Sequence, residues 1–251
     1  MRSLYCCLVL SILVLSAGVA SAAGYSANGF ESFTLGDLNG QDGWDGSVTS
    51  GGEAPRVVAA PDPVLGSKAV RLYVGDAQGD ASDMHRAITP IEAVSGTVVT
   101  VSYDIYRPMP AAGMVAQNMW WWWDDAGTPT YGLQWDIGGT LPNGWNPGAG
   151  TAPTVYDRYA NVKMVWDFTQ MKAYSWYDGN IVDNGIDVSG ITTLTGWAIH
   201  LAHESDNGTG ASTAYIDNFS IGVEVVPEPA SLLALASGLI GLGGLAIRRR
   251  R

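Results

Sequence analysis

The most unusual feature of the sequence is a run of four consecutive tryptophans, Trp120 to Trp123, in a chain with ten tryptophans in all. Successive side chains of a strand point to opposite faces, so a strand would send two of these indoles to each face. One pair can fill the core, whereas the other pair must meet a ligand or be covered by loops. An exposed indole offers an apolar platform to the C–H face of a sugar ring, so the outer pair would form a saccharide-binding surface.

By the alternation of the other strands, we expect Asn118, Trp120 and Trp122 on the outer face. Polar side chains of two further strands would lie nearby on the same face and bind sugar hydroxyls. These residues are Gln134, Asp136 and His200. The alternative stays open that loops cover the tryptophans as a second small core.

Catalytic motifs give no support for an enzyme. A retaining glycosidase needs two carboxylates about 5 Å apart, and neither E-x-D-x-x-E nor E-x-D-x-E occurs in the sequence. G-x-S-x-G, H-E-x-x-H and the P-loop are also absent. His200 and His203 have opposite parity on a strand and would point apart. We therefore expect a protein without catalytic residues, with a glycan hydrolase or lyase of unrecognised site as the alternative.

The elements that would position these residues are short β-rich segments separated by Gly, Pro, Asn and Asp. The predicted strands are residues 56–60, 69–74, 97–106, 114–123, 130–137, 161–167, 172–177, 196–203 and 214–223. Residues 167–179 predict a hairpin with its turn near Thr169-Gln170-Met171. Many short strands without intervening helices predict an all-β fold, an antiparallel β-sandwich formed by residues 24–224.

Alternation within these strands predicts which face is buried. Residues 99, 101, 103 and 105 are large and apolar, whereas residues 100, 102 and 104 are polar. In the same way, Trp197, Ile199 and Leu201 oppose Ala198, His200 and Ala202. One face of each strand therefore belongs to the core, and the other meets water or ligand.

The N-terminus predicts a signal peptide over residues 1–23. Arg2 precedes an apolar run, and Ala20-Ser21-Ala22-Ala23 supplies the small residues of a cleavage site after Ala22 or Ala23. The signal would hand the chain to the Sec translocon. The chain's two cysteines, Cys6 and Cys7, lie in this segment, so the mature protein would have no disulfide.

The C-terminus, residues 225–251, predicts a sorting tail with a transmembrane helix. Pro227-Glu228-Pro229 precedes an apolar run from Leu232 to Ile247, which would span about 24 Å as a helix, against roughly 30 Å for a bilayer core. Four arginines close the chain: Arg248, Arg249, Arg250 and Arg251. They would stay on the cytoplasmic side and leave the domain outside. An ordinary single-span anchor is the alternative.

This tail resembles the PEP-CTERM sorting signal of Gram-negative bacteria, in which a Pro-Glu-Pro motif, a hydrophobic helix and an arginine cluster stand in this order. The resemblance implies recognition and cleavage by an exosortase, after a transient stay in the inner membrane. It also implies release or attachment at the cell surface or extracellular matrix. Such proteins often accompany exopolysaccharide and biofilm production.

The domain itself resembles concanavalin-A-like, or LamG-like, jelly rolls. The segments that carry the resemblance are Phe30-Glu31-Ser32-Phe33, residues 38–44, Trp176-Tyr177-Asp178-Gly179 and Tyr215-Ile216-Asp217-Asn218-Phe219. A galactose-binding-like jelly roll is the near alternative. In related jelly rolls, positions like Glu31 and Asp217 hold a structural calcium, so the resemblance implies a Ca²⁺ site there. The acidic segment with Asp76, Asp80 and Asp83 is a weaker candidate, because its spacing does not match an EF-hand loop.

Charge limits the partners of the domain. Five of the 13 basic residues lie at the two ends of the chain, so 8 basic residues face 24 acidic ones between them, a balance of −16. Such a domain repels nucleic acid and anionic lipid. We therefore expect an exported, non-catalytic, carbohydrate-binding protein of the cell surface. A structural matrix protein without a discrete ligand site is the alternative.

Overall fold

The structure is a computed structural model that describes residues 20–75, 77, 79–108, 116–124, 129–137, 142–144, 155–202 and 211–225. Its side chains are described for residues 24–75, 77, 79–108, 155–202 and 211–225. Apart from one short 3-10 helix, η1 (Asn28–Phe30), these residues form strands, turns and loops. The predicted all-β fold is confirmed. Within the described part, no helix is long and apolar enough to cross a membrane; residues 232–247 lie outside it.

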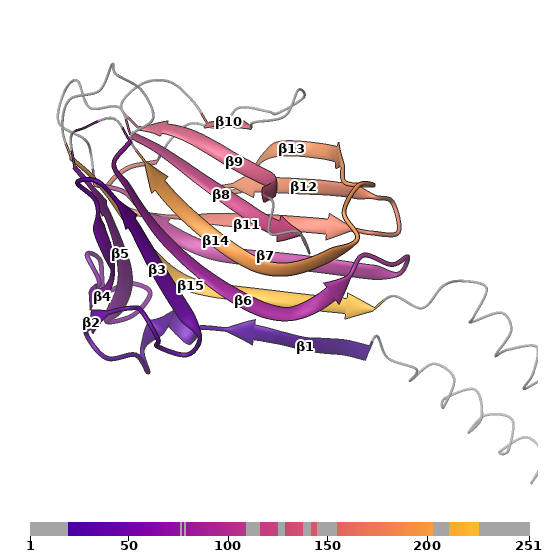
Figure 1. Ribbon diagram of the computed structural model, residues 1–251, viewed down its shortest axis with the longest axis horizontal. Coiled ribbons are helices and arrows are strands. Elements are labelled where there is room, and N and C mark those ends of the chain that lie inside the picture. Colours follow the sequence, from indigo (N-terminus) through magenta and orange to yellow (C-terminus); the bar gives the residue numbers. More distant parts are fainter. Residues whose placement is uncertain are drawn as a thin grey trace, which may run out of the picture.

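Two antiparallel sheets lie face to face (Figure 1). The nine-stranded sheet has the order β13-β12-β11-β7-β15-β5-β4-β2, with β1 also paired to β15. Its strands are β1 (Ala20–Ser26), β2 (Gly36–Asp37), β4 (Glu53–Ala59), β5 (Lys68–Val74), β7 (Thr97–Tyr106), β11 (Tyr159–Asp167), β12 (Lys172–Tyr177), β13 (Asn180–Asp187) and β15 (Ser212–Val225).

The six-stranded sheet has the order β10-β9-β8-β14-β6-β3. Its strands are β3 (Trp44–Thr49), β6 (Ala81–Glu92), β8 (Ala116–Asp124), β9 (Pro129–Ile137), β10 (Pro142–Gly144) and β14 (Thr193–Ala202). All nine strands expected from the sequence form, with small shifts at their ends, and β11 and β12 make the expected hairpin. Strands β1, β3, β6 and β13 are the longer ones that the sequence did not predict, and the first four residues of β1, 20–23, belong to the predicted signal peptide.

The core lies between the sheets and is rich in aromatic residues. The Phe219 ring packs edge-on against Trp44 at a centroid distance of 4.9 Å and lies 6.2 Å from Trp197, which in turn packs edge-on against Trp166 at 5.9 Å. Trp44, Trp166, Trp197 and Phe219 are all fully buried. The predicted alternation is confirmed for β7, whose residues 99, 101, 103 and 105 are buried while residues 100, 102 and 104 are partly exposed. In β14, residues 197, 199 and 201 are core residues as expected, but Ala198 and Ala202 of the opposite face are buried as well.

Strand β15 changes partner halfway along its length. Its first half pairs with β5 and its second half with β1. At the junction the register against β7 shifts between Asp217 and Ser220, and Asn218 has a φ of +48°. Gly29 of η1 approaches this bulge so closely that a Cβ there would lie 3.2 Å from side-chain oxygens of Asp217 and Asn218. Asp217 lies on the outer face by ordinary alternation with Tyr215, and the bulge after it returns Phe219 to the core.

The aromatic core makes a direct prediction for stability. Phe219→Ala should lower the free energy of unfolding by about 3–5 kcal/mol, because it removes a buried ring and leaves a cavity. Leu35→Ala is the matched control, since Leu35 is 59% exposed, and should change stability by less than about 0.5 kcal/mol. Urea unfolding of the full-length protein, followed by circular dichroism, measures both. Similar losses for the two variants would contradict the core described above.

Candidate functional site

A row of polar residues crosses the outer face of the six-stranded sheet. Ser47 of β3, Asp83 of β6 and His200 of β14 are successive cross-strand partners. Ser47 Oγ donates to Asp83 Oδ2 at 3.0 Å, and His200 Nδ1 contacts Asp83 Oδ1. Asp83 therefore lies between the other two side chains and fixes the His200 ring through one nitrogen.

The register continues this row into strands β8 and β9. His200 pairs with the position of Met119, and Met119 pairs with Gln134. In the next row, Asp136 pairs with Gln117, which pairs with Ala202. Because directly paired residues of neighbouring strands share a face, the predicted Gln134, Asp136 and His200 occupy one face of the sheet.

The register corrects the expected position of the other three predicted residues. Asn118 pairs with Leu201, Trp120 with Ile199 and Trp122 with Trp197. These three partners on β14 are buried in the core, so positions 118, 120 and 122 share the core-side face and not the face of His200. The sequence could not show this, because two of the four consecutive indoles face outward whichever pair faces the core. The side chains of β8 and β9 themselves lie outside the described residues.

The face of His200 instead receives positions 121 and 123. Trp121 pairs with Ala198 on one side and Gly132 on the other, and Trp123 pairs with Gly196. The two partners of Trp121 thus carry at most a methyl group, whereas Trp123 has Gly196 on one side and Pro129 on the other. The outer face thus combines two tryptophan positions with the polar row of Ser47, Asp83 and His200.

The polar row does not form a nucleophile–base pair. Its carboxylate stands between the serine and the histidine, whereas acyl transfer requires a histidine that contacts the serine. The side chains of this row can accept hydrogen bonds from a hydroxyl-rich ligand and donate hydrogen bonds to it. The carboxylate also orients His200 as it would a general base, so the geometry alone does not decide between binding and turnover.

The two residues of the predicted calcium site have different surroundings. Glu31 Oε1 accepts hydrogen bonds from the backbone N–H groups of Ser67 at 2.6 Å and Lys68 at 3.0 Å, and Oε2 accepts one from Ser67 Oγ at 2.6 Å. The Ser67 hydrogen bond is the main reason that the pKa of Glu31 is lowered. Both oxygens are therefore committed to this loop.

Asp217, in contrast, is fully buried, and its Oδ2 has no hydrogen-bond partner among the described residues. Calcium needs six to eight oxygens, but the described residues contain no group of three acidic, histidine or cysteine side chains that could hold a metal. Calcium at Glu31 and Asp217 thus stays a prediction from the sequence, and the contacts of Glu31 argue against it. Asp80 accepts a hydrogen bond from Gly51 N at 2.7 Å, and Asp76 lies outside the described residues.

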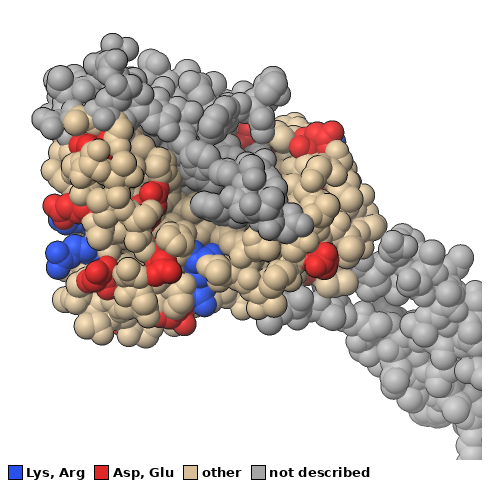
Figure 2. All heavy atoms as spheres, in the orientation of Figure 1, with Lys and Arg blue, Asp and Glu red and all other residues tan. Residues whose placement is uncertain are grey.

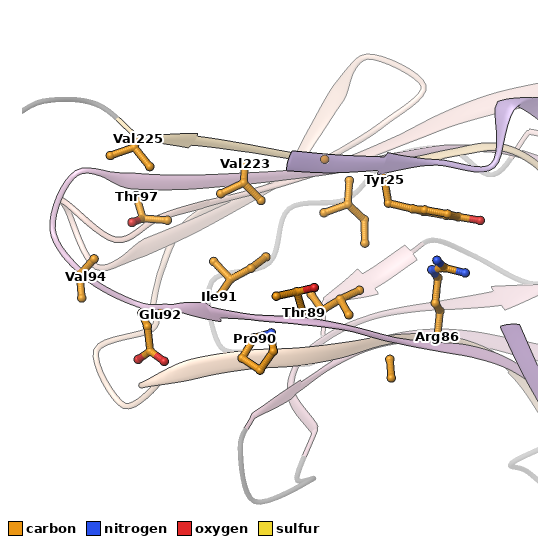
Figure 3. A pocket seen from close by; sticks show the side chains of 14 residues that line it. Tyr25, Arg86, Thr89, Pro90, Ile91, Glu92, Val94, Thr97, Val223 and Val225 are labelled. Carbon is orange, nitrogen blue, oxygen red and sulfur yellow. The ribbon is translucent and has the colours of Figure 1, made fainter. Parts of the chain in front are cut away.

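An apolar cleft of about 600 Å³ opens between β6 and the β1–β15 edge (Figure 3). Aliphatic side chains such as Ile91, Val223 and Val225 line most of it, and the Arg86 guanidinium stacks 3.7 Å from the Tyr25 ring centroid at one end. None of the residues predicted to bind sugar lies in this cleft. On the face seen in Figure 2, acidic side chains are scattered over the described surface, whereas basic side chains form two small groups.

The C-terminal residues 225–251 match the family described as PEP-CTERM protein-sorting motif. This confirms the identification made from Pro227-Glu228-Pro229 and the terminal arginines, whose structure lies outside the described residues. The motif marks an exported protein that an exosortase processes and that is sorted to the cell envelope. A comparison of the sequence with curated proteins finds no match.

Similar solved structures share the sandwich. A sialidase has a TM-score of 0.57 at 11% identity, and the match covers 81% of this chain but only 18% of the sialidase. The cellulose induced protein Cip1 has a TM-score of 0.54 at 14% identity, covering 80% of this chain and 96% of Cip1. A carbohydrate esterase from Shiga toxin-encoding bacteriophage phi24B has a TM-score of 0.54 at 17% identity, covering 84% of this chain and all of the esterase. These likenesses show the fold, a jelly-roll β-sandwich.

Burial of Asp217 predicts a pH-dependent stability. Desolvation, followed by the nearby Asp104 and Glu31 carboxylates, raises the pKa of Asp217 from 3.8 to about 6. The folded state then holds this proton more tightly than the unfolded state, so the contribution to stability is full below about pH 4 and is lost as the pH rises through about 6.

Asp217→Asn should therefore be more stable than the wild type by roughly 2–3 kcal/mol at about pH 8, and the difference should shrink toward about pH 4. Asparagine keeps the acceptor for Asn218 N, which lies 2.7 Å from Asp217 Oδ1. Chemical unfolding of both proteins across this range measures the difference. A variant less stable than the wild type at high pH would show that the ionised carboxylate has a partner that this account lacks.

Proposed function

We propose that the exported domain binds extracellular polysaccharide on the outer face of its six-stranded sheet and does not cleave it. The observation that carries this proposal is the register that puts tryptophan positions 121 and 123 on the same outer face as Ser47, Asp83 and His200. Indoles would stack on the apolar faces of sugar rings, and the polar row would bind their hydroxyls. A ligand site of a few polar groups beside aromatic surface is the usual composition of such sites.

In this proposal, the two terminal segments of the chain determine the route by which the protein reaches the cell surface. Residues 1–23 would direct the chain to the Sec translocon, and the apolar helix 232–247 would lodge in the inner membrane of a Gram-negative cell. Exosortase cleavage near Pro227-Glu228-Pro229 would then free the domain for the cell surface or for a matrix of exopolysaccharide. The acidic balance of the domain supports a glycan partner over nucleic acid or anionic lipid.

Glycan binding is tested by titrating the full-length protein in detergent micelles against a panel of polysaccharides, with tryptophan fluorescence as the signal. Trp121→Ala should weaken binding at least about tenfold, because a buried aromatic contact is commonly worth more than 1 kcal/mol. Trp120→Ala is the matched control: it should lower stability while leaving the affinity of the folded fraction nearly unchanged.

The titration also separates the competing functions. No binding to any glycan by a folded protein would favour a structural matrix protein. If the protein released new sugar ends and His200→Gln abolished that release, the protein would be a hydrolase or lyase. This result, or the absence of glycan binding, would overturn the proposal.

The sorting tail predicts a processing defect. Glu228→Ala should abolish exosortase cleavage and leave the uncleaved precursor in the inner-membrane fraction of the native cell. Glu224→Ala is the matched control, since Glu224 is an exposed residue of β15 just outside the motif, and it should be processed normally. Cell fractionation with immunoblotting measures both. Normal cleavage of Glu228→Ala would contradict the assigned role of the motif.

A further inference from the structure

The first and last strands of the described chain pair with each other. Strand β1 (Ala20–Ser26) lies antiparallel to the last part of β15, so that Ala20 pairs with Val225. Figure 1 shows the start of β1 and the end of β15 side by side at one end of the sandwich. In the sequence, Val226 alone separates β15 from the sorting motif Pro227-Glu228-Pro229. The predicted signal peptide therefore ends beside the strand that leads into the sorting motif.

A β-bulge divides β1 at the predicted cleavage positions of the signal peptide. The register against β15 shifts between Ala22, which pairs with Val223, and Tyr25, which pairs with Ile221. Strand β1 thus has one residue more than β15 between these two pairs, as in a bulge. Cleavage after Ala22 or Ala23 would cut the chain at this bulge and split β1 into two parts.

The part of β1 that follows the bulge, Tyr25–Ser26, is fixed by side-chain contacts. Tyr25 Oη donates to Asp42 Oδ2 at 2.8 Å and accepts a hydrogen bond from Trp44 Nε1 at 2.9 Å. The Arg86 guanidinium lies 3.7 Å from the centroid of the Tyr25 ring, as a cation–π contact. These contacts do not involve residues 20–22, so Tyr25–Ser26 would stay in place after the signal peptide is removed. We call this part the retained half of β1.

The part before the bulge, Ala20–Ala22, covers one edge of β15, and we call it the removable half. Residues 223–225 of β15 pair with this half on one side and with residues 97–99 of β7 on the other. Removal of the signal peptide would leave the pairing with β7 and free the backbone N–H and C=O groups of the opposite edge. A free edge of this kind can accept a further strand.

We propose, on the basis of the export route proposed above, that the exosortase binds this freed edge of β15 and therefore cleaves the tail only after the signal peptide has been removed. An enzyme that cuts near Pro227-Glu228-Pro229 must come close to residues 223–225, which the structure holds extended against β7. While the removable half is paired, it occupies the backbone groups that the enzyme would use. The contact is made by the main chain, so Glu224→Ala still leaves processing normal.

The position of the edge favours the processing enzyme over a second copy of the chain. Stable interfaces between proteins bury about 1,200–2,000 Å², and residues 223–225 offer far less than that. The same residues adjoin the sorting motif, so a strand added here would extend directly to the cleavage position.

The test is a pulse–chase of the full-length protein in the native cell, with immunoblotting that separates the precursor from products cut at either end. Ala22→Phe combined with Ala23→Phe puts bulky residues at both predicted cleavage positions, where signal peptides need small ones. This uncleaved variant keeps the removable half. Its tail should be cleaved at least about tenfold more slowly than the wild-type tail, because the strand pairing must open before the enzyme can bind.

A second variant separates the effect of the paired strand from that of an additional membrane anchor. Ala20→Pro and Ser21→Pro are added to the uncleaved variant. Successive N–H groups of a strand point to opposite sides, so one of the two prolines removes an N–H that faces β15. The signal peptide is still attached, but cleavage of the tail should return close to the wild-type rate.

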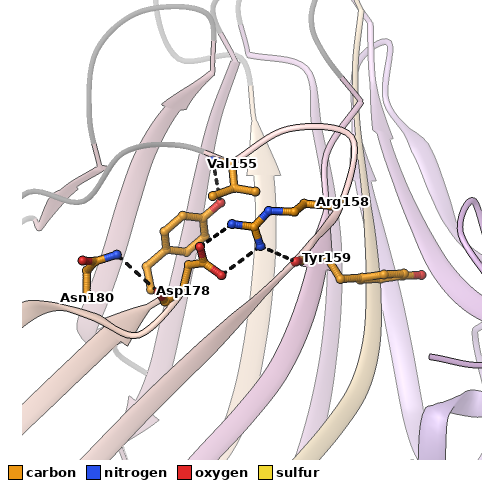
Figure 4. Close-up of polar contacts among 6 residues, drawn as sticks. Val155, Arg158, Tyr159, Asp178 and Asn180 are labelled. Carbon is orange, nitrogen blue, oxygen red and sulfur yellow. Dashed lines mark hydrogen bonds and ion pairs between the residues drawn. The ribbon is translucent and has the colours of Figure 1, made fainter. Parts of the chain in front are cut away.

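The contacts of the retained half supply a further comparison. Tyr25→Ala, added to the uncleaved variant, leaves β1 with backbone pairing alone and should restore part of the rate. Arg158→Ala is the matched control. Arg158 binds both oxygens of Asp178, at 3.0 Å and 2.5 Å (Figure 4), at the opposite end of the nine-stranded sheet, where Tyr159 pairs with Tyr106. This substitution should leave cleavage as slow as in the uncleaved variant.

Three results would overturn the proposal. The first is cleavage of the tail at the wild-type rate in the uncleaved variant. The second is cleavage that stays slow after the two prolines are added, because the additional membrane anchor would then be the cause. The third is cross-linking of two mature domains through residues 223–225, which would make a second copy the occupant of the edge. A wild-type tail that is never cleaved would instead refute the export route itself.

Discussion

The hydrogen-bond register between β8 and β14 decides which residues of the tryptophan run can meet a ligand. A strand alternates its side chains with a period of two, so a shift of one residue would exchange the faces of all four indoles. Strand β14 fixes the choice, because Trp197, Ile199 and Leu201 are anchored in the aromatic core with Phe219 and Trp166. The core thereby decides which two tryptophan positions belong to the proposed ligand face.

The sequence predicted the fold through alternation. Strands such as β7 and β14 have large apolar residues at every second position, and their buried faces are the expected ones. Strand β6 escaped prediction because Asp83, His85 and Arg86 interrupt its apolar residues and because it contains Pro90. Proline is tolerated there since β3 pairs with β6 only as far as Arg86, so Pro90 has a free edge on that side.

The candidate site was predictable only in part. The sequence named Gln134, Asp136 and His200, which the register places on one face, but it gave no way to choose between the two parities of Trp120 to Trp123. The sequence predicts Asp83, the partner of His200, as part of an acidic loop, whereas it lies in β6. The surroundings of Asp217 depend on a bulge where β15 changes partner from β5 to β1, and long-range pairing of this kind leaves no local signal in the sequence.

The two outer faces of the sandwich differ in their chemistry. The six-stranded sheet presents two tryptophan positions and the polar row of Ser47, Asp83 and His200, whereas the nine-stranded sheet presents a row of tyrosines that continues into Arg71. Both suit a protein that the PEP-CTERM tail sends out of the cytoplasm. With no cysteine beyond Cys7, the domain relies on its aromatic core to keep both faces in place.

Residue-resolved hydroxyl-radical footprinting of the four consecutive tryptophans, with and without a bound polysaccharide, tests the central claim most directly. The account predicts that Trp121 and Trp123 are oxidised in the free protein and protected by the glycan, while Trp120 and Trp122 stay unreactive in both states. Protection of Trp120 and Trp122, with Trp121 and Trp123 unreactive throughout, would show that the opposite face is the ligand face and would contradict the account.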